Sequence, residues 1–226
     1  MTQNPRLIVM LTHNDQTILD AVSTFENCID LPVQYWGFKD VGIPHSEMCR
    51  LIDAMKAAGK KTVLEVVTYT EESCMRAARF ACEYGFDYLM GTLFFPSVWN
   101  FLKTQPIQYF PFVGDVYGSP SVLTGNTEDM VNQANEFYEQ DIPGIDILAY
   151  RYNNGCPDKL VQQVVLRSKT KTVVAGSIDS VERIKTVKEY NPWGFTMGSA
   201  LFSQKFVRNA GCRANLERVL HLMDVA

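Results

Sequence analysis

Apolar, β-branched and aromatic residues occur in short runs along the chain, and each run is followed by a segment with apolar residues at helical spacing. We predict eight strands, over residues 6–12, 33–38, 62–67, 87–91, 109–113, 145–150, 172–175 and 194–197. No hairpin signal separates consecutive strands, so they are predicted to be parallel and joined by right-handed crossovers. Eight strand and helix pairs predict a single (β/α)8 TIM barrel of the α/β class, forming one domain over residues 1–226.

The predicted helices begin at residues that commonly cap helices. Ser46 precedes an apolar face that ends at Gly59, and Thr70, Thr127 and Ser180 stand before three further apolar faces. The caps support the alternation of strands and helices.

The same alternation could also form an open, doubly wound sheet. An open sheet that binds a dinucleotide carries a glycine-rich turn after its first strand, and residues 12–16 contain no glycine. Several predicted strands instead end in glycine, a small residue suited to one rim of a barrel: Gly37, Gly91, Gly114, Gly176 and Gly198. These observations favour the closed barrel.

Composition and charge narrow the class of partner. The chain has 226 residues, 46% of them hydrophobic and 20% charged, and a net charge of −4. An acidic chain lacks the basic surface that nucleic acid requires, so we predict no nucleic-acid partner.

The six cysteines are scattered, without the close pairs typical of zinc sites, and we expect them to be free thiols. The sequence shows neither a cleavable leader nor an apolar run of membrane-spanning length. We therefore expect a cytoplasmic protein without a membrane partner, and we leave homo-oligomerisation open.

Two Gly-Ser pairs end the last two predicted strands. They are Gly176-Ser177 and Gly198-Ser199, and glycine followed by serine lets backbone N–H groups and a hydroxyl approach an anion. The segment 172–202 resembles the tandem phosphate-binding motif of the ribulose-phosphate-binding barrels, which are isomerases, epimerases, lyases and synthases of phosphorylated metabolites. The resemblance implies that these four residues bind phosphate. Ser177 departs from the pattern, because many members have a second glycine there.

We expect a bulky residue at position 198 to block phosphate while the fold survives. The phosphate of FMN would also suit these loops, so the sequence leaves FMN open as a cofactor.

A second, partial likeness involves the third predicted strand. Residues 64–66 and 90–92 resemble strand ends of the 2-keto-3-deoxy-6-phosphogluconate aldolases, which form a Schiff base through a lysine on the sixth strand. Residues 144–156 contain no lysine here, and Arg151 cannot act as an amine nucleophile. If an imine forms, Lys39 is the lysine placed at the carboxyl end of a strand.

Polar residues at the predicted strand ends form the candidate site, because these barrels carry function at that face. The candidate catalytic residues are Lys39, Glu65, Asp115 and Arg151, and the candidate substrate-binding residues are His13, Asn14, Thr92 and Tyr150. Glu65 interrupts an apolar strand, where a carboxylate is costly unless it is paired or used. We therefore expect Lys39 and Glu65 to face one cavity from neighbouring strands. No metal site is predicted, although carboxylates such as Asp15 leave Mg²⁺ open.

The leading hypothesis is an enzyme of carbohydrate metabolism that acts on a small phosphorylated sugar or keto acid by isomerisation, epimerisation or carbon–carbon cleavage. In this hypothesis Lys39 stabilises an oxyanion, Glu65 or Asp115 moves a proton, and Arg151 orients an anionic group. The alternatives are a class I aldolase that uses Lys39, and a non-catalytic barrel that binds a phosphometabolite or FMN.

Overall fold

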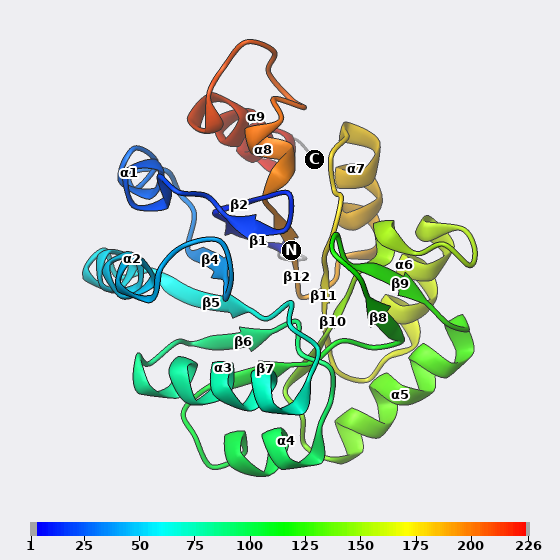
Figure 1. Cartoon of the computed structure of the whole chain (residues 1–226). Coiled ribbons are helices and arrows are strands. Elements are labelled where there is room, and N and C mark those ends of the chain that lie inside the picture. The colour runs from blue at the N-terminus through cyan, green and yellow to red at the C-terminus, as the bar shows by residue number, and fades with distance from the viewer. Residues whose placement is uncertain (1–3, 225–226) are drawn as a thin grey trace.

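The computed structural model describes residues 4–224, and its eight main strands form one parallel sheet surrounded by helices (Figure 1). The strands are β1 (Arg6–Met10), β4 (Tyr35–Lys39), β5 (Lys61–Glu65), β6 (Tyr88–Met90), β7 (Gln108–Phe110), β10 (Gly144–Ile147), β11 (Lys171–Val174) and β12 (Gly194–Met197). Their order in the sheet is β10-β11-β12-β1-β4-β5-β6-β7. All eight predicted strands are confirmed.

The sheet closes between its two outer strands, β7 and β10. Phe112 and Asp146 form a parallel bridge, the Asp146 N–H donates to the Pro111 carbonyl at 2.9 Å, and the Val113 N–H donates to the Asp146 carbonyl at 3.2 Å. The (β/α)8 barrel is therefore confirmed, and the open sheet is excluded.

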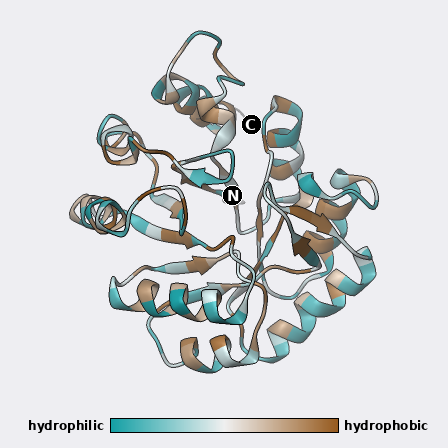
Figure 2. Cartoon of the chain, in the orientation of Figure 1, coloured by the Kyte–Doolittle hydropathy of each residue, from teal (hydrophilic) through white to brown (hydrophobic). Residues whose placement is uncertain are grey.

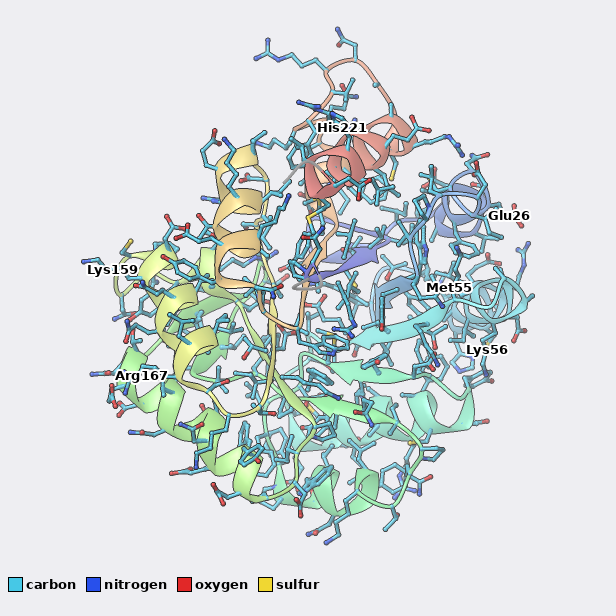
Figure 3. The ribbon with its side chains drawn as sticks, turned by 180° about the vertical axis from the view of Figure 1, so that it is seen from behind. Glu26, Met55, Lys56, Lys159, Arg167 and His221 are labelled. Carbon is cyan, nitrogen blue, oxygen red and sulfur yellow. The ribbon has the colours of Figure 1, made fainter. Side chains whose placement is uncertain are left out.

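Helices cover the outside of the barrel. They are α1 (Ala21–Glu26), α2 (His45–Ala57), α3 (Glu71–Glu83), α4 (Pro96–Leu102), α5 (Thr127–Glu139), α6 (Pro157–Arg167), α7 (Val181–Tyr190), α8 (Ser199–Phe202) and α9 (Cys212–Asp224), with a short 3-10 helix η1 (Ala149–Arg151). Charged side chains such as Lys56, Lys159 and Arg167 lie on the outer side of this ring (Figure 3). Figure 2 shows alternating hydrophilic and hydrophobic positions along these helices, as expected for one buried face.

Two of the four predicted helix caps are confirmed. The Thr70 side chain accepts from the Ser73 N–H in a capping box, and the Ser180 side chain accepts from the Arg183 N–H. The other two were misplaced. Asn126 caps α5 in place of Thr127, because its side chain accepts from the Glu128 N–H, and α2 begins at His45 after the extended Pro44.

Two short antiparallel hairpins stand at the carboxyl ends of β1 and β7, where no hairpin was predicted. One joins β2 (Thr12–His13) to β3 (Gln16–Thr17), and the other joins β8 (Asp115–Tyr117) to β9 (Val122–Thr124). In the first, Asn14 and Asp15 have positive φ angles of 48° and 61°. Asparagine and aspartate tolerate this conformation, so the pair makes a tight turn without glycine.

The barrel interior is apolar below the cavity, away from the carboxyl ends of the strands. A buried cluster of strand residues fills it, consisting of Ile8, Met10, Val63, Met90, Phe110 and Val173. Tyr35, Tyr88 and Trp193 pack against this cluster, and the Arg6 guanidinium lies 4.9 Å from the Trp193 ring centre. This aromatic layer fills the amino-terminal end, so a ligand has access from the carboxyl ends of the strands.

Within residues 4–224, no helix combines the length and the apolar character needed to span a membrane. All six cysteines are free thiols.

Candidate active site

One cavity opens at the carboxyl ends of the strands, and both groups of predicted residues contribute to it. Its lining includes Lys39, Glu65 and Arg151 from the candidate catalytic set, and Gly176, Ser177, Gly198 and Ser199 from the candidate phosphate loops. It also includes residues that were not in those sets, among them Asp15, Asp179, Thr196 and Lys205. The tertiary structure thus places the charged residues and the Gly-Ser loops in one site.

Lys39 and Glu65 meet inside the barrel mouth. They are register partners on β4 and β5, their side chains are about 5% exposed, and Lys39 Nζ lies 3.5 Å from Glu65 Oε1. The prediction that they face one cavity from neighbouring strands is confirmed. Burial of each charge is compensated by the opposite charge beside it.

Asp15 is a third member of this charged group, and it connects three loops. It accepts from Lys39 Nζ at 3.0 Å, from Arg151 Nη2 at 2.7 Å and from the Ser121 N–H at 2.8 Å. Arg151 also donates to the Ser121 carbonyl at 3.3 Å, and Ser121 is hydrogen-bonded to the Tyr69 hydroxyl. Asp15 therefore holds the β2–β3 turn, the β8–β9 loop and η1 against the strand ends.

These contacts determine the charge of Asp15. Burial alone would raise its pKa, but the hydrogen bonds and positive charges of Arg151 and Lys39 outweigh that effect and hold the pKa well below the ordinary value. Asp15 is thus an anion that balances the nearby cations. The sequence alone indicated Asp15 only as one of the carboxylates that leave Mg²⁺ open.

The two Gly-Ser loops form the other wall of the cavity. Gly176 and Ser177 have positive φ angles of 76° and 54°, so Ser177 takes the left-handed conformation that glycine adopts most easily. This conformation is the physical reason why glycine suits position 177. The Asn14 N–H donates to Ser199 Oγ at 3.1 Å, which joins the last loop to the β2–β3 turn.

Gly198 has a packing role that is independent of any ligand. A Cβ atom at this position would lie 2.5 Å from Thr12 Oγ1 and 2.9 Å from the Thr12 carbonyl oxygen. A larger residue would disturb the loop against the chain that follows β1. The expectation that the fold survives substitution at 198 is therefore not supported.

Charged side chains also lie beside the phosphate loops. Arg183 Nη1 lies 2.5 Å from Asp179 Oδ1, and Lys205 Nζ lies 3.8 Å from Asp179 Oδ2. Lys205 is half exposed and lies in the lining of the cavity.

Five predicted residues do not line the cavity. Asp115 is exposed at the start of β8, beside a separate hollow that Phe94 and Gln133 also line. Thr92 is buried and hydrogen-bonded to the Tyr109 hydroxyl at 2.6 Å, between the strands and the helices. The Tyr150 ring lies 4.8 Å from the Arg183 guanidinium.

The other two lie in the β2–β3 hairpin. Asn14 is exposed and contributes its backbone N–H to the Ser199 contact. The His13 ring packs 6.3 Å from the Phe202 ring.

Asp146 on β10 is a buried carboxyl group that the sequence analysis missed. It is 0% exposed, and neither of its oxygens has a hydrogen-bond partner among residues 4–224. The signal was the same as for Glu65, a carboxylate inside an apolar strand. Its place inside the predicted strand 145–150, away from the strand end, kept it out of the candidate set.

The described part of the chain contains no group of three or more histidine, cysteine, aspartate or glutamate residues arranged to hold a metal ion.

No family model and no curated protein sequence matches this chain. Solved structures with the same architecture do match. Orotidine 5'-phosphate decarboxylase from Pyrococcus horikoshii aligns with a TM-score of 0.71 and 10% identity over 97% of this chain and 100% of its own.

Tryptophan synthase chains match in the same way. A mutant tryptophan synthase α-subunit from Pyrococcus furiosus aligns with a TM-score of 0.68 and 13% identity over 98% of this chain and 100% of its own. A tryptophan synthase structure from Mycobacterium tuberculosis gives 0.68 and 14% identity over 99% of this chain and 94% of its own. These likenesses confirm the barrel fold that the motif resemblance implied.

Proposed function

We propose that this protein is an enzyme that acts on a small phosphorylated sugar or keto acid by moving a proton next to a carbonyl group. The reaction class is isomerisation, epimerisation or carbon–carbon cleavage through an enediolate-like intermediate. One observation carries the proposal. The buried Lys39, Asp15 and Glu65 group and the two Gly-Ser loops line the same cavity.

The two walls suit the two ends of such a substrate. Backbone N–H groups of the loops at Gly176 and Gly198, with the Ser177 and Ser199 hydroxyls, would hold the phosphate. The resemblance of these loops to a phosphate-binding motif supports this assignment, as does the name of the decarboxylase neighbour, which acts on a 5'-phosphate.

The charged wall supplies the groups that proton transfer requires. The Lys39 ammonium would stabilise the oxyanion that forms at the carbonyl oxygen, and Glu65 would remove or return the proton. Asp15 and Ser121 occupy one edge of the Arg151 guanidinium, so a second anionic group of the substrate would bind at its other edge.

The test is hydrogen exchange in heavy water. The protein is incubated with a panel of phosphorylated aldoses, ketoses and keto acids, and deuterium incorporation next to the carbonyl is followed by NMR. Glu65→Gln is expected to slow exchange at least about 100-fold, the usual contribution of a general base. If the wild type catalyses exchange and Glu65→Gln exchanges at the same rate, Glu65 is not the base.

A class I aldolase is a second candidate, because Lys39 lies in the cavity from a strand. An imine forms at the lysine nitrogen and can be reduced to a stable amine, so borohydride trapping separates the two mechanisms. Trapping by the wild type, lost in Lys39→Met, would establish the aldolase mechanism. Binding of phosphorylated compounds without exchange or trapping would leave a non-catalytic binding barrel.

A further inference from the structure

Asp146 places a carboxyl group inside the barrel, shielded from water. It is 0% exposed, and its register partner on β11 is Val173, which belongs to the apolar cluster of the interior. Residues paired in parallel strands point to the same side of the sheet, so the Asp146 side chain points into the barrel. Neither carboxyl oxygen finds a hydrogen-bond donor among the residues that the structure describes.

The charges that face Asp146 come from three elements of the site. Lys39 on β4 and Arg151 on η1 favour its anion, and Glu65 on β5 opposes it. The two cations are already matched by two carboxylates, Asp15 and Glu65. An ionised Asp146 would add an unmatched negative charge in a dry interior, which is costly.

Burial is the largest influence on this group. It raises the pKa of Asp146 well above 3.8, and repulsion by Glu65 acts in the same direction. The positive charges of Lys39 and Arg151 act against it but do not outweigh it.

We propose that Asp146 carries a proton in the folded protein, and that it is a positioning residue whose neutral side chain adds no charge beside the Lys39–Glu65 pair. Two carboxylates at one site compete for negative charge, and the one without partners keeps the proton. This inference rests on the proposed function only where it treats Glu65 as the base. The protonated state of Asp146 can be tested without any substrate.

The pH dependence of folding gives the first test. Below pH 3.8 the side chain is protonated in both the folded and unfolded states. As pH rises above that value the unfolded chain releases this proton while the folded chain keeps it, so the wild type loses stability. Asp146→Asn has a similar shape and no proton to release. We expect wild-type stability to fall relative to Asp146→Asn as pH rises from 3.8 to neutral, measured by urea unfolding.

Thr92→Val is the matched control, because it also removes a buried polar group at the carboxyl end of a strand. Threonine does not titrate, so its difference from the wild type should stay constant over the same range. If wild-type stability rises relative to Asp146→Asn, or does not change, Asp146 is an anion in the fold and the proposal is wrong.

Infrared spectroscopy gives a second test that needs no unfolding. The wild type at neutral pH should show the carbonyl stretch of a protonated carboxylic acid, which shifts when aspartate is labelled with ¹³C and is absent in Asp146→Asn. Absence of this band in the wild type would overturn the proposal even if the variant does not fold.

The heavy-water exchange assay separates the two proposals. If the wild type catalyses exchange, Asp146→Asn should change the pH profile of the rate. An unchanged pH profile would show that Asp146 does not influence Glu65. If no substrate exchanges, the proposed function fails, and the infrared and unfolding results still decide the state of Asp146.

Discussion

Arg151 and Asp15 lie 136 positions apart in the chain, and their side chains form a two-pronged ion pair with 2.7 Å between Arg151 Nη2 and Asp15 Oδ1. Asp15 also holds Lys39 and the Ser121 N–H, so the pair joins three loops over the barrel mouth. This arrangement makes one carboxylate responsible for much of the geometry of the site.

Asp15→Asn should destabilise the fold by about 3 to 5 kcal/mol, because it leaves the buried Lys39 and the partly buried Arg151 short of one negative charge. Asparagine tolerates the positive φ of 61° at this position, so the backbone should not add to the cost. Urea unfolding measures the effect. Asp115→Asn removes an exposed carboxylate as the control and should change stability by less than about 0.5 kcal/mol. If the two variants lose the same unfolding free energy, the ion pairs of Asp15 do not stabilise the fold.

Acid should weaken the fold through Asp15. Its pKa is lowered in the folded state, so its contribution is present above the ordinary value of 3.8 and is lost as pH falls below it toward the folded value. The difference in unfolding free energy between wild type and Asp15→Asn should therefore shrink below pH 3.8. A difference that stays constant down to strongly acidic pH would show that Asp15 does not titrate in this way.

Lys39→Met and Glu65→Gln should each cost about 3 to 5 kcal/mol, because each leaves a buried charge unmatched. In the double variant Asp15 still faces Arg151, so the charges balance and stability should largely return. Unfolding and heavy-water exchange are measured on all three proteins. Restored stability without exchange would support the catalytic role, and recovery of both would make the pair structural.

Ser177→Asp should weaken phosphate binding at least about tenfold by placing a negative charge at the loop. Ser177→Asn is the matched control, because asparagine has nearly the same shape, also tolerates a φ of 54° and carries no charge. Inorganic phosphate affinity is measured by calorimetry for both. Equal affinities of the two variants would place the anion elsewhere.

Gly198→Ala should destabilise the fold by about 1 to 3 kcal/mol even without ligand, because the added methyl group meets the Thr12 carbonyl. Gly211→Ala is the control, since a Cβ atom there meets nothing within 4 Å. Thermal unfolding compares them. If the two variants unfold at the same temperature, the loop accommodates the added methyl group and the predicted clash with Thr12 is wrong.

Much of the fold could be predicted from local pattern. All eight strands and the caps at Thr70 and Ser180 follow from hydrophobic periodicity and from side chains that bond to their own backbone. Lys39 and Glu65 were also predictable as neighbours, because both interrupt apolar strands that are consecutive in the chain. Such features depend on residues that are close in sequence, so the sequence pattern is sufficient to predict them.

The completed site depended on contacts between distant segments. A polar residue after a strand can turn into the cavity, as Arg151 does, or behind the strands, as Thr92 does, and only the packing of the next layer decides between them. Asp15 reaches Lys39 only because the tight turn at Asn14 and Asp15 folds back over the strand ends.

Sequence by itself determined the order of strands and helices, the Gly-Ser loops and three of the charged residues that line the cavity. The tertiary structure decided that Asp15 and Glu65 share the cavity and that Asp146 is buried inside the barrel. Asp146 became buried because the barrel closes between β7 and β10, two strands that flank a hairpin and a helix in the chain. The charge of a carboxyl group depends on the water and the cations around it, and those are supplied by the fold as a whole.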